Sequence, residues 1–305
     1  MTLRETLTAA TSRLATDPHL RETASRDAEI LLLHSLGLPR TALYSDPTRE
    51  LTASQLAAFE SAVIRRLALE PIQYITGTQE FYGLALHVTP AVLIPRPETE
   101  LLVESVLAIF ATFPADLPLR LADVGTGSGA IAIAIAHHLP QAHITALDLS
   151  AAALAVAAQN AETHHVADRI TFLQSDLLAA VPGRTFHAIL SNPPYIPGSD
   201  LATLHPQVRE YEPHDALFAG PSGLDVYRRL IPEAEHALTP GGLLALEIGH
   251  GQQQAVSQLL HQWMDLSVIK DLQGIPRTVL ARRPARTDGS ETPQSNGVPN
   301  RQAER

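Results

Sequence analysis

The sequence of 305 residues contains no cysteine. This absence excludes disulfide bonds and thiolate metal ligands. Long hydrophobic runs are missing too, because charges or prolines interrupt every apolar stretch before it reaches the ~18 residues that span a bilayer. The opening stretch, MTLRETLTAATSRLATD, lacks the apolar segment of a secretory signal and carries acids early, unlike a transit peptide. We therefore expect a cytoplasmic protein without a membrane partner.

Positive charge is scarce: 22 Lys and Arg stand against 32 Asp and Glu, which gives a formal net charge of −10. The arginines are scattered, apart from short pairs such as Arg65-Arg66 and Arg228-Arg229. Tight binding to a phosphate backbone needs clustered Lys and Arg that release counterions. We therefore expect no DNA partner.

Metal-binding patterns are also absent, although the chain has 14 histidines. The adjacent pairs His137-His138 and His164-His165 would face different directions on a helix. No His-x3-His or His-Glu-x-x-His spacing occurs, so we expect no metal site. What is present is ordinary: 45% hydrophobic and 18% charged residues indicate a globular protein, long enough for about two domains.

Residues 1–71 predict a small helical domain, because apolar residues recur at spacings of three and four from Leu3 onward. A second helix is expected to begin after Ser25 as N-cap and to end at Gly37. Residues 72–95 are richer in β-branched and aromatic residues and contain spaced glycines, which predicts a β-hairpin linker.

Residues 96–283 alternate strand-like and helical patterns, which predicts an α/β domain with a doubly wound parallel sheet of seven strands. Only DLQGIP separates the last two strands, so these should pair antiparallel. Residues 284–305 are polar without apolar periodicity and predict a disordered tail. The expected strands are 119–124, 143–148, 170–174, 187–191, 243–248, 266–270 and 278–282.

A glycine-rich loop, GTGSG, follows the first of these strands. Gly125, Gly127 and Gly129 permit a tight turn and close approach of a ligand, at the sheet edge where doubly wound folds bind ligands. Asp148 ends the next strand, where a carboxylate can accept both ribose hydroxyls of an adenosine. The loop also fits the dinucleotide fingerprint, so by itself it leaves NAD and S-adenosylmethionine open.

Three more acids stand at strand ends. Asp123 precedes the glycine loop, where a carboxylate suits the cationic amino acid tail of S-adenosylmethionine better than a pyrophosphate. Asp176 follows the third strand, where it could accept from the exocyclic amine of adenine or cap a short helix. For Glu247, at the end of the fifth strand, we expect a structural or supporting role.

The segment SNPPYI, residues 191–196, follows the apolar strand FHAIL, and its two prolines end that strand. The Asn192 side-chain carbonyl and the Pro193 backbone carbonyl can each accept an N–H, while Tyr195 offers a flat ring. Such a site suits a planar group bearing –NH2. Holding that nitrogen in line for methyl transfer can contribute ~7–11 kcal/mol, and both acceptors bind it more tightly as it becomes positive.

Longer segments carry a resemblance to a family. In order they are PIQYITGTQEFYGLALHVTPAVLIPRPETELLVE, DVGTGSGAIAIAIA, SNPPYI, REYEPHDALFAGPSGLDVYRRLI, LTPGGLLALEIGHGQ and VIKDLQGIPRTVLAR. Over residues 20–283 the chain resembles the protein-(glutamine-N5) methyltransferases of class 1 peptide chain release factors, the PrmC/HemK-type family.

This resemblance implies a class I S-adenosylmethionine-dependent methyltransferase domain and a helical N-terminal domain that docks the release factor. The substrate would be the glutamine of the factor's Gly-Gly-Gln loop, the product S-adenosylhomocysteine, and the process translation termination. Leu177 stands where the family often has a large aromatic residue. The implied cofactor-binding residues are Gly125, Thr126, Gly127, Ser128, Gly129, Asp148, Asp176, Leu177 and Asn192. The implied substrate-binding residues are Asn192, Pro193, Pro194 and Tyr195, of which Asn192, Pro193 and Tyr195 are the catalytic ones.

Three alternatives stay open on the residues alone. An adenine-N6 methyltransferase would use the same Asn-Pro-Pro-Tyr site but would need a positively charged surface for a flipped base. An NAD-dependent oxidoreductase would leave the segment from Asn192 to Tyr195 unexplained. A non-catalytic adaptor for translation factors would not require the intact glycine loop.

Overall fold

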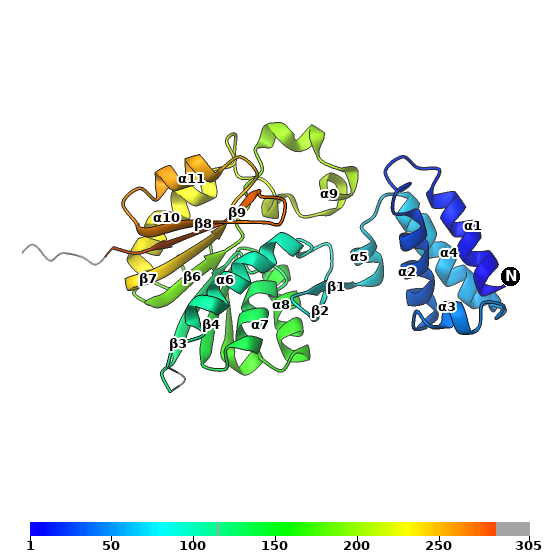
Figure 1. Ribbon diagram of the computed structural model, residues 1–305, viewed down its shortest axis with the longest axis horizontal. Coiled ribbons are helices and arrows are strands. Elements are labelled where there is room, and N and C mark those ends of the chain that lie inside the picture. The colour runs from blue at the N-terminus through cyan, green and yellow to red at the C-terminus, as the bar shows by residue number, and fades with distance from the viewer. Residues whose placement is uncertain (115, 285–305) are drawn as a thin grey trace, which may run out of the picture.

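The computed structural model describes residues 1–114 and 116–284, so the predicted tail lies outside the described residues from position 285 on. Within the described part, no helix is both long and apolar enough to cross a membrane. Figure 1 shows a helical lobe at one end, a large α/β lobe at the other and the segment 72–95 between them.

The helical lobe packs around apolar side chains at helical spacing, of which Leu3, Leu14 and Leu31 are fully buried. Thr2 and Glu5 form a capping box at its first helix, with each side chain accepting the other residue's backbone N–H. The helices are α1 (Leu3–Leu14), α2 (Ala24–Leu36), α3 (Ala42–Ser45) and α4 (Ala53–Leu67).

The sequence predicted both ends of α2, its N-cap at Ser25 and its end at Gly37. Gly37 ends the helix with a left-handed φ of 61°, as predicted. The predicted N-cap Ser25 is wrong, because the N-cap is Thr23, two residues earlier, and α2 begins at Ala24. The first turn is closed there by Asp27 N donating to Thr23 O, and Asp27 also accepts from the Thr23 hydroxyl at 3.0 Å.

The α/β lobe contains the predicted seven-stranded sheet, in the order β5-β4-β3-β6-β7-β9-β8. β9 runs antiparallel to both β7 and β8, as the short DLQGIP connection predicted, while the other neighbours are parallel. The strands are β3 (Leu119–Val124), β4 (Ala142–Asp148), β5 (Ile170–Gln174), β6 (Phe186–Ser191), β7 (Leu238–Glu247), β8 (Met264–Lys270) and β9 (Pro276–Arg282).

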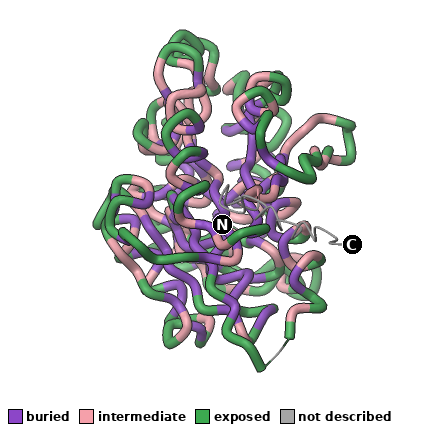
Figure 2. The backbone as a smooth tube through the Cα atoms, turned by 90° about the vertical axis from the view of Figure 1, so that its left-hand side faces the viewer, coloured by how far each residue is buried: buried purple, intermediate pink, exposed green. Residues whose placement is uncertain are grey.

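Helices cover both faces of this sheet, because consecutive strand residues point to opposite faces. Leu121 packs in one buried layer with α6 and α7, whereas Ala122 packs in the other with α10 and α11. Figure 2 shows this buried interior in purple. The longer helices are α6 (Glu100–Phe110), α7 (Ala130–His138), α8 (Ala151–Thr163), α10 (Asp225–Ala237) and α11 (Gln253–Leu259). The shorter helices are η1 (Pro97–Thr99), η2 (Ala167–Arg169), η3 (Gly198–Thr203), α9 (Pro206–Tyr211) and η4 (His214–Ala216).

The connecting segment contains the predicted hairpin, β1 (Thr78–Phe81) and β2 (Leu84–His87), preceded by the short helix α5 (Ile72–Thr76). Asn160 of α8 fastens the hairpin to the α/β lobe. Its Oδ1 accepts from His87 N at 2.7 Å, and its Nδ2 donates to His87 O and to Ser128 O, both at 2.9 Å. The hairpin is thereby held against the loop that follows β3.

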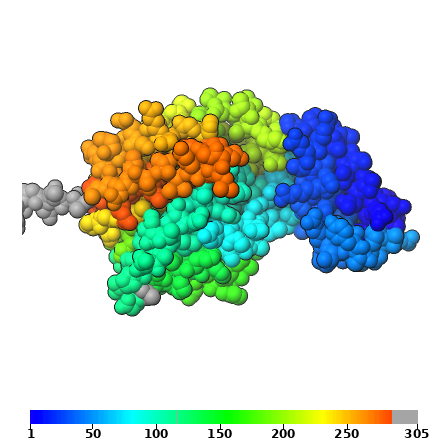
Figure 3. Space-filling view, in the orientation of Figure 1, coloured from blue at the N-terminus to red at the C-terminus, as the bar shows by residue number. Residues whose placement is uncertain are grey.

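The two lobes also touch through α9, seen in yellow-green beside the blue lobe in Figure 3. His19 and His205 meet edge to face with ring centroids 5.0 Å apart. Arg66 donates to the Gln207 side chain at 3.3 Å, and the Tyr211 hydroxyl donates to the carbonyl of Ala68 at 2.7 Å. Domain boundaries at residues 71, 95 and 283 remain predictions.

Candidate active site

The glycine loop sits at the carboxyl end of β3 and is held by the end of β4. The N–H groups of Gly125 and Thr126 both donate to Leu147 O, at 2.8 and 3.0 Å. Asp148 connects the glycine loop to the start of α8, because its carboxylate accepts from Gly127 N and from Ser150 N, each at 2.8 Å. The carboxylate predicted to contact a ribose therefore also anchors the loop.

The three glycines differ in their surroundings, although all have positive φ. A Cβ added to Gly125 or Gly127 would meet nothing within 4 Å, so open space lies above the loop at both positions. A Cβ on Gly129 would come within 2.9 Å of Ile133 and 3.1 Å of Ala157. Two glycines therefore leave room for a ligand, and the third allows α7 and α8 to pack closely.

Asp123 lies beneath this loop and is 1% exposed. Its Oδ2 accepts from the Thr126 hydroxyl at 2.7 Å and from Ala132 N at 3.2 Å. Its Oδ1 is buried and has no hydrogen-bond partner among the described residues. Burial raises the pKa of this carboxyl to about 7, against the two hydrogen bonds, which lower it. An unpartnered buried carboxylate oxygen suits a cationic ligand group.

Asp176 and Leu177 follow β5 in a turn. The Asp176 carboxylate pairs with Arg229 of α10 at 2.7 Å, and both side chains are about half exposed. Leu177 has a left-handed φ of 50° and packs partly buried against the core. The turn thus lies beside the carboxyl edge of the sheet, while the adenine contacts predicted for both residues remain predictions.

The SNPPYI segment brings its polar groups to the same edge. Ser191 ties the end of β6 to β3 by donating to Val124 O at 2.6 Å. The Asn192 Nδ2 donates to the Thr99 hydroxyl at 3.1 Å. Among residues 1–114 and 116–284, we find no donor to Asn192 Oδ1 or to the Pro193 carbonyl oxygen. Both oxygens therefore lack a hydrogen-bond partner within the described part of the chain, with Asn192 half-buried and Pro193 buried.

Glu247, at the end of β7, lies behind these groups and is 2% exposed. Its Oε2 accepts from the Thr99 hydroxyl at 2.6 Å, and its Oε1 lies 3.4 Å from the Tyr195 hydroxyl. The Tyr227 hydroxyl donates to its backbone carbonyl at 2.9 Å. Desolvation raises the pKa of Glu247 to about 7, and burial raises that of the Tyr195 hydroxyl as well. The supporting role expected for Glu247 fits this placement.

Gln252 fixes the backbone of the SNPPYI segment, a role that the sequence analysis missed. Its Nε2 donates to Tyr195 O at 2.9 Å and to Gly223 O at 3.2 Å, while its Oε1 accepts from Gly249 N at 3.0 Å. A Cβ at Gly223 would lie 2.3 Å from Tyr195 O. The Gly-Pro-Ser-Gly segment, residues 220–223, therefore packs against the backbone of Tyr195. Gln252 ends the LEIGHGQ segment quoted for the family resemblance, which is the only sequence signal that pointed to it.

A second buried carboxylate, Glu212, joins the start of η1 to the segment after α9. It pairs with Arg96 at 2.5 Å and accepts from Ile94 N at 3.2 Å, and its side chain is fully buried. This pair holds the Pro-Arg-Pro-Glu-Thr-Glu segment, including Thr99, across the strand ends. The pairing of Arg96 with Glu212 was not predicted from the sequence.

Two family descriptions match the chain. The PrmC N-terminal domain matches residues 5–77, and the methyltransferase small domain matches residues 99–208. Curated relatives called release factor glutamine methyltransferase include the protein of Koribacter versatilis, which is 45% identical over 258 residues, covering 84% of this chain and 90% of that protein. The Moorella thermoacetica protein is 46% identical over 286 residues, covering 93% and 99%.

The chain belongs to the release factor glutamine methyltransferase family. It is therefore an enzyme of the methyltransferase class, and the resemblance drawn from its motifs is confirmed.

Solved structures support the fold of the α/β lobe. The hMettl16 catalytic domain in complex with a 3′UTR hairpin is 14% identical with a TM-score of 0.53, covering 74% of this chain and 81% of that chain. A T. thermophilus 16S rRNA methyltransferase in complex with AdoMet and guanosine is 19% identical with a TM-score of 0.51, covering 68% and 49%. The predicted fold, a class I methyltransferase domain with a helical N-terminal domain, is confirmed.

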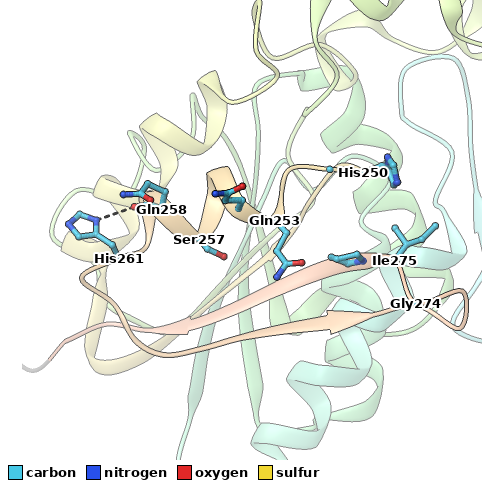
Figure 4. Close-up of a pocket in the computed structure, with 10 residues that line it drawn as sticks. His250, Gln253, Ser257, Gln258, His261, Gly274 and Ile275 are labelled. Carbon is cyan, nitrogen blue, oxygen red and sulfur yellow. Dashed lines mark hydrogen bonds between the residues drawn. The ribbon is translucent and has the colours of Figure 1, made fainter.

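A pocket of ≈ 800 Å³ lies between α11 and the turn joining β8 to β9, and no residue of the glycine loop or of the SNPPYI segment lines it. Figure 4 shows His250, Gln253, Ser257 and Gln258 on one side and Ile275 on the other. The lining combines amide, hydroxyl and imidazole side chains with Ile275, Pro276 and two glycines, and it includes no Asp, Glu, Lys or Arg. Across the described residues, no group of three or more His, Asp or Glu side chains is arranged to hold a metal ion.

Proposed function

We propose that this protein transfers a methyl group from S-adenosylmethionine to the side-chain amide nitrogen of the glutamine in the Gly-Gly-Gln loop of class 1 peptide chain release factors, in support of translation termination. The observation that carries the proposal is the pair of acceptors without a donor among the described residues, Asn192 Oδ1 and the Pro193 carbonyl, beside Tyr195 at the edge that holds the open glycine loop. The family's name supplies the substrate class.

The residues around the loop fit S-adenosylmethionine. Open space above Gly125 and Gly127 leaves room for it, and Asp148 retains acceptor capacity for ribose hydroxyls beyond its two backbone bonds. The unpartnered Oδ1 of Asp123 suits its ammonium group. When bound, the cofactor supplies an electrophilic methyl carbon on sulfur. Thr126, Ser128, Gly129, Asp176 and Leu177 complete the proposed cofactor site.

The SNPPYI residues would act on the glutamine amide. Asn192 Oδ1 and the Pro193 carbonyl each accept one of its N–H groups, which orients the nitrogen lone pair. Pro194 and Tyr195 frame the planar amide. The nitrogen bonds to the methyl carbon as the carbon–sulfur bond breaks, S-adenosylhomocysteine remains, and the nitrogen gives up one proton to solvent. The nitrogen is positive in the transition state, so both acceptors bind it most tightly there.

The helical domain, residues 1–71, would dock the release factor away from the chemistry and thereby contribute remote binding energy. Its attachment through the hairpin and through α9 places it beside the carboxyl edge of the sheet (Figure 1). A cytoplasmic location and the absence of DNA, membrane and metal partners belong to the same proposal.

The deciding experiment incubates the pure protein with methyl-labelled S-adenosylmethionine and unmodified release factor. Matched samples contain a release factor whose loop glutamine is replaced by alanine, or duplex DNA. We expect label only on the wild-type loop glutamine, located by peptide mass spectrometry. Asn192→Ala should lower turnover by roughly 10²–10³, the loss typical of removing a transition-state hydrogen-bond partner.

Label on duplex DNA with none on the factor would overturn the proposal in favour of an adenine-N6 methyltransferase. No label on any acceptor, together with no binding of S-adenosylmethionine in calorimetry, would favour the adaptor.

A further inference from the structure

We infer that Thr99 and Glu247 are positioning residues, which set the orientation of the Asn192 amide and hold Tyr195 beside it. The inference rests on the proposed function for its meaning, because the amide of Asn192 must present oxygen to the substrate. Neither residue is expected to touch the glutamine. Thr99 comes from η1 and Glu247 from β7, so the arrangement joins two elements that are 148 positions apart in the chain.

The orientation follows from counting protons. A threonine hydroxyl has one proton to donate and two lone pairs to accept with. The Thr99 proton points to Glu247 Oε2 at 2.6 Å, because an ionised carboxylate only accepts. Toward Asn192, at 3.1 Å, the hydroxyl can only accept. The group of Asn192 that faces it must therefore be the –NH2, and the carbonyl oxygen is left facing the site.

Burial makes this constraint strong. Thr99 is 4% exposed and Glu247 is 2% exposed, so water does not compete for their hydrogen bonds. A carboxylate buried this deeply costs free energy unless its oxygens have partners. Here each oxygen has one: Thr99 on Oε2 and the Tyr195 hydroxyl, 3.4 Å away, on Oε1. Glu247 thus contacts Tyr195 directly and acts on Asn192 through the Thr99 hydroxyl.

Charge adds a second consequence. An ionised Glu247 accepts from both partners, whereas a protonated one must donate through one oxygen, so one of the two contacts has to reverse. The groups that face it from the neighbouring elements are Glu98 of η1, Arg277 of β9, Tyr195 and Tyr227. The pKa of Glu247 is raised to about 7, because desolvation and then Glu98 raise it more than Thr99, Arg277 and Tyr195 lower it. Turnover should therefore fall as the pH drops through about 7.

The kinetic test compares Thr99→Val, which keeps the shape and loses the hydroxyl, with Thr99→Ser, which keeps the hydroxyl. With release factor and S-adenosylmethionine saturating, Thr99→Val should lower kcat by about threefold to tenfold, the size expected for one net hydrogen bond, and Thr99→Ser should stay within about twofold of wild type. Calorimetry and thermal unfolding of both variants report whether cofactor affinity and folding are intact. Unchanged kcat in Thr99→Val would overturn the inference.

The pH test uses Glu247→Gln, which cannot ionise. Wild-type kcat should rise with pH through about 7, and this rising limb of the pH profile of kcat should be absent from Glu247→Gln. The matched control is Thr99→Ser, which leaves the Glu247 carboxyl in place and keeps the hydroxyl that it contacts. With saturating cofactor it should retain the limb. A limb that persists in Glu247→Gln would contradict the inference.

A third readout needs no substrate. In NMR spectra, the Asn192 side-chain –NH2 signals, assigned by their loss in Asn192→Ala, should have the order parameter of a rigid group in wild type and Thr99→Ser. They should become mobile in Thr99→Val. If wild type fails to methylate the release factor, the proposed function fails while this measurement still decides the inference: equal order parameters in Thr99→Val and wild type would refute it.

Discussion

The carboxylate of Asp148, at the end of β4, accepts a hydrogen bond from the backbone N–H of Gly127 at 2.8 Å. The end of β4 therefore holds the glycine loop that follows the neighbouring strand, β3. The same carboxylate also accepts from Ser150 N at 2.8 Å, which begins α8. Loop shape and proposed cofactor binding depend on one side chain.

We predict that Asp148→Ala loses both functions together. The dissociation constant for S-adenosylmethionine should rise at least tenfold, because ribose acceptors are lost and the loop is no longer anchored. Unfolding free energy should fall by about 1–3 kcal/mol for the lost charge-assisted hydrogen bonds. Calorimetry and urea denaturation measure the two effects. Asp148→Asn, which keeps one acceptor oxygen, should lie between wild type and Asp148→Ala in both, and wild-type affinity in the alanine variant would refute the cofactor role.

Substitutions at two glycines of the loop should separate protein stability from cofactor binding. Gly129→Ala places a Cβ 2.9 Å from Ile133 and 3.1 Å from Ala157 at a φ of +82°, so strain and overpacking should lower unfolding free energy by about 2–4 kcal/mol. Gly127→Ala meets no protein atom within 4 Å, and its φ is +56°. It should cost only about 1 kcal/mol of stability but weaken cofactor binding by tenfold or more.

Urea denaturation and calorimetry on both variants give the comparison directly. Equal destabilisation by the two substitutions would contradict the packing assigned to Gly129. Wild-type cofactor affinity in Gly127→Ala would contradict the site proposed above the loop.

Asp123 predicts a pH dependence of stability. The pKa of Asp123 in the folded protein, about 7, lies above the ordinary aspartate value of 3.8, so between these values the folded protein holds a proton that the unfolded chain releases. Stability from this group is therefore greatest below the unfolded pKa and is lost as the pH rises through about 7. Asp123→Asn, which stays neutral, should gain about 2–3 kcal/mol relative to wild type between pH 5 and pH 8.

Chemical denaturation of both proteins at the two pH values measures this difference. Saturating S-adenosylmethionine should reduce it, because an ammonium group next to Asp123 favours its ionised form. A difference between the proteins that does not change with pH would show that Asp123 is ionised throughout.

The ion pair between Arg66 and Asp27 predicts a strong effect in the helical lobe. Both side chains are 6% exposed, their atoms are 2.8 Å apart, and Arg66 also donates to Gln207 of α9. Arg66→Leu should lower the stability of the lobe by about 3–5 kcal/mol, because it leaves a buried carboxylate unpaired. The double variant with Asp27→Asn should recover part of this loss, which unfolding of the full chain by circular dichroism can show. Additive losses in the double variant would exclude this explanation.

Much of the α/β lobe could be predicted from sequence because its signals are local. The strands are apolar runs, the glycine loop stands between a strand and a helix, and a connection too short for a helix indicated that β8 and β9 pair antiparallel. The methyltransferase fold and the family followed from these segments. The start of α2 could not be predicted to the residue, because Ser25 and Thr23 are both acceptable N-caps.

The supporting residues of the site were harder to predict because they are defined by long-range contacts. Glu212 and Arg96 are 116 positions apart, and Gln252 and Tyr195 are 57 apart. A glutamate or glutamine at such a position has no local pattern that separates it from a surface residue. The orientation of the Asn192 amide belongs to the same class, since it depends on a hydroxyl from η1.

Asn160 has a consequence for how the two lobes can be exchanged or engineered. Its amide joins α8, the hairpin and the glycine loop, so the hairpin belongs mechanically to the catalytic lobe rather than to the helical one. A chimera that replaces the helical lobe should therefore be cut before the hairpin, at Gly77. A fusion point after His87 would remove both bonds with His87, so the buried Asn160 Oδ1 would lose its donor and Nδ2 would keep only Ser128 O.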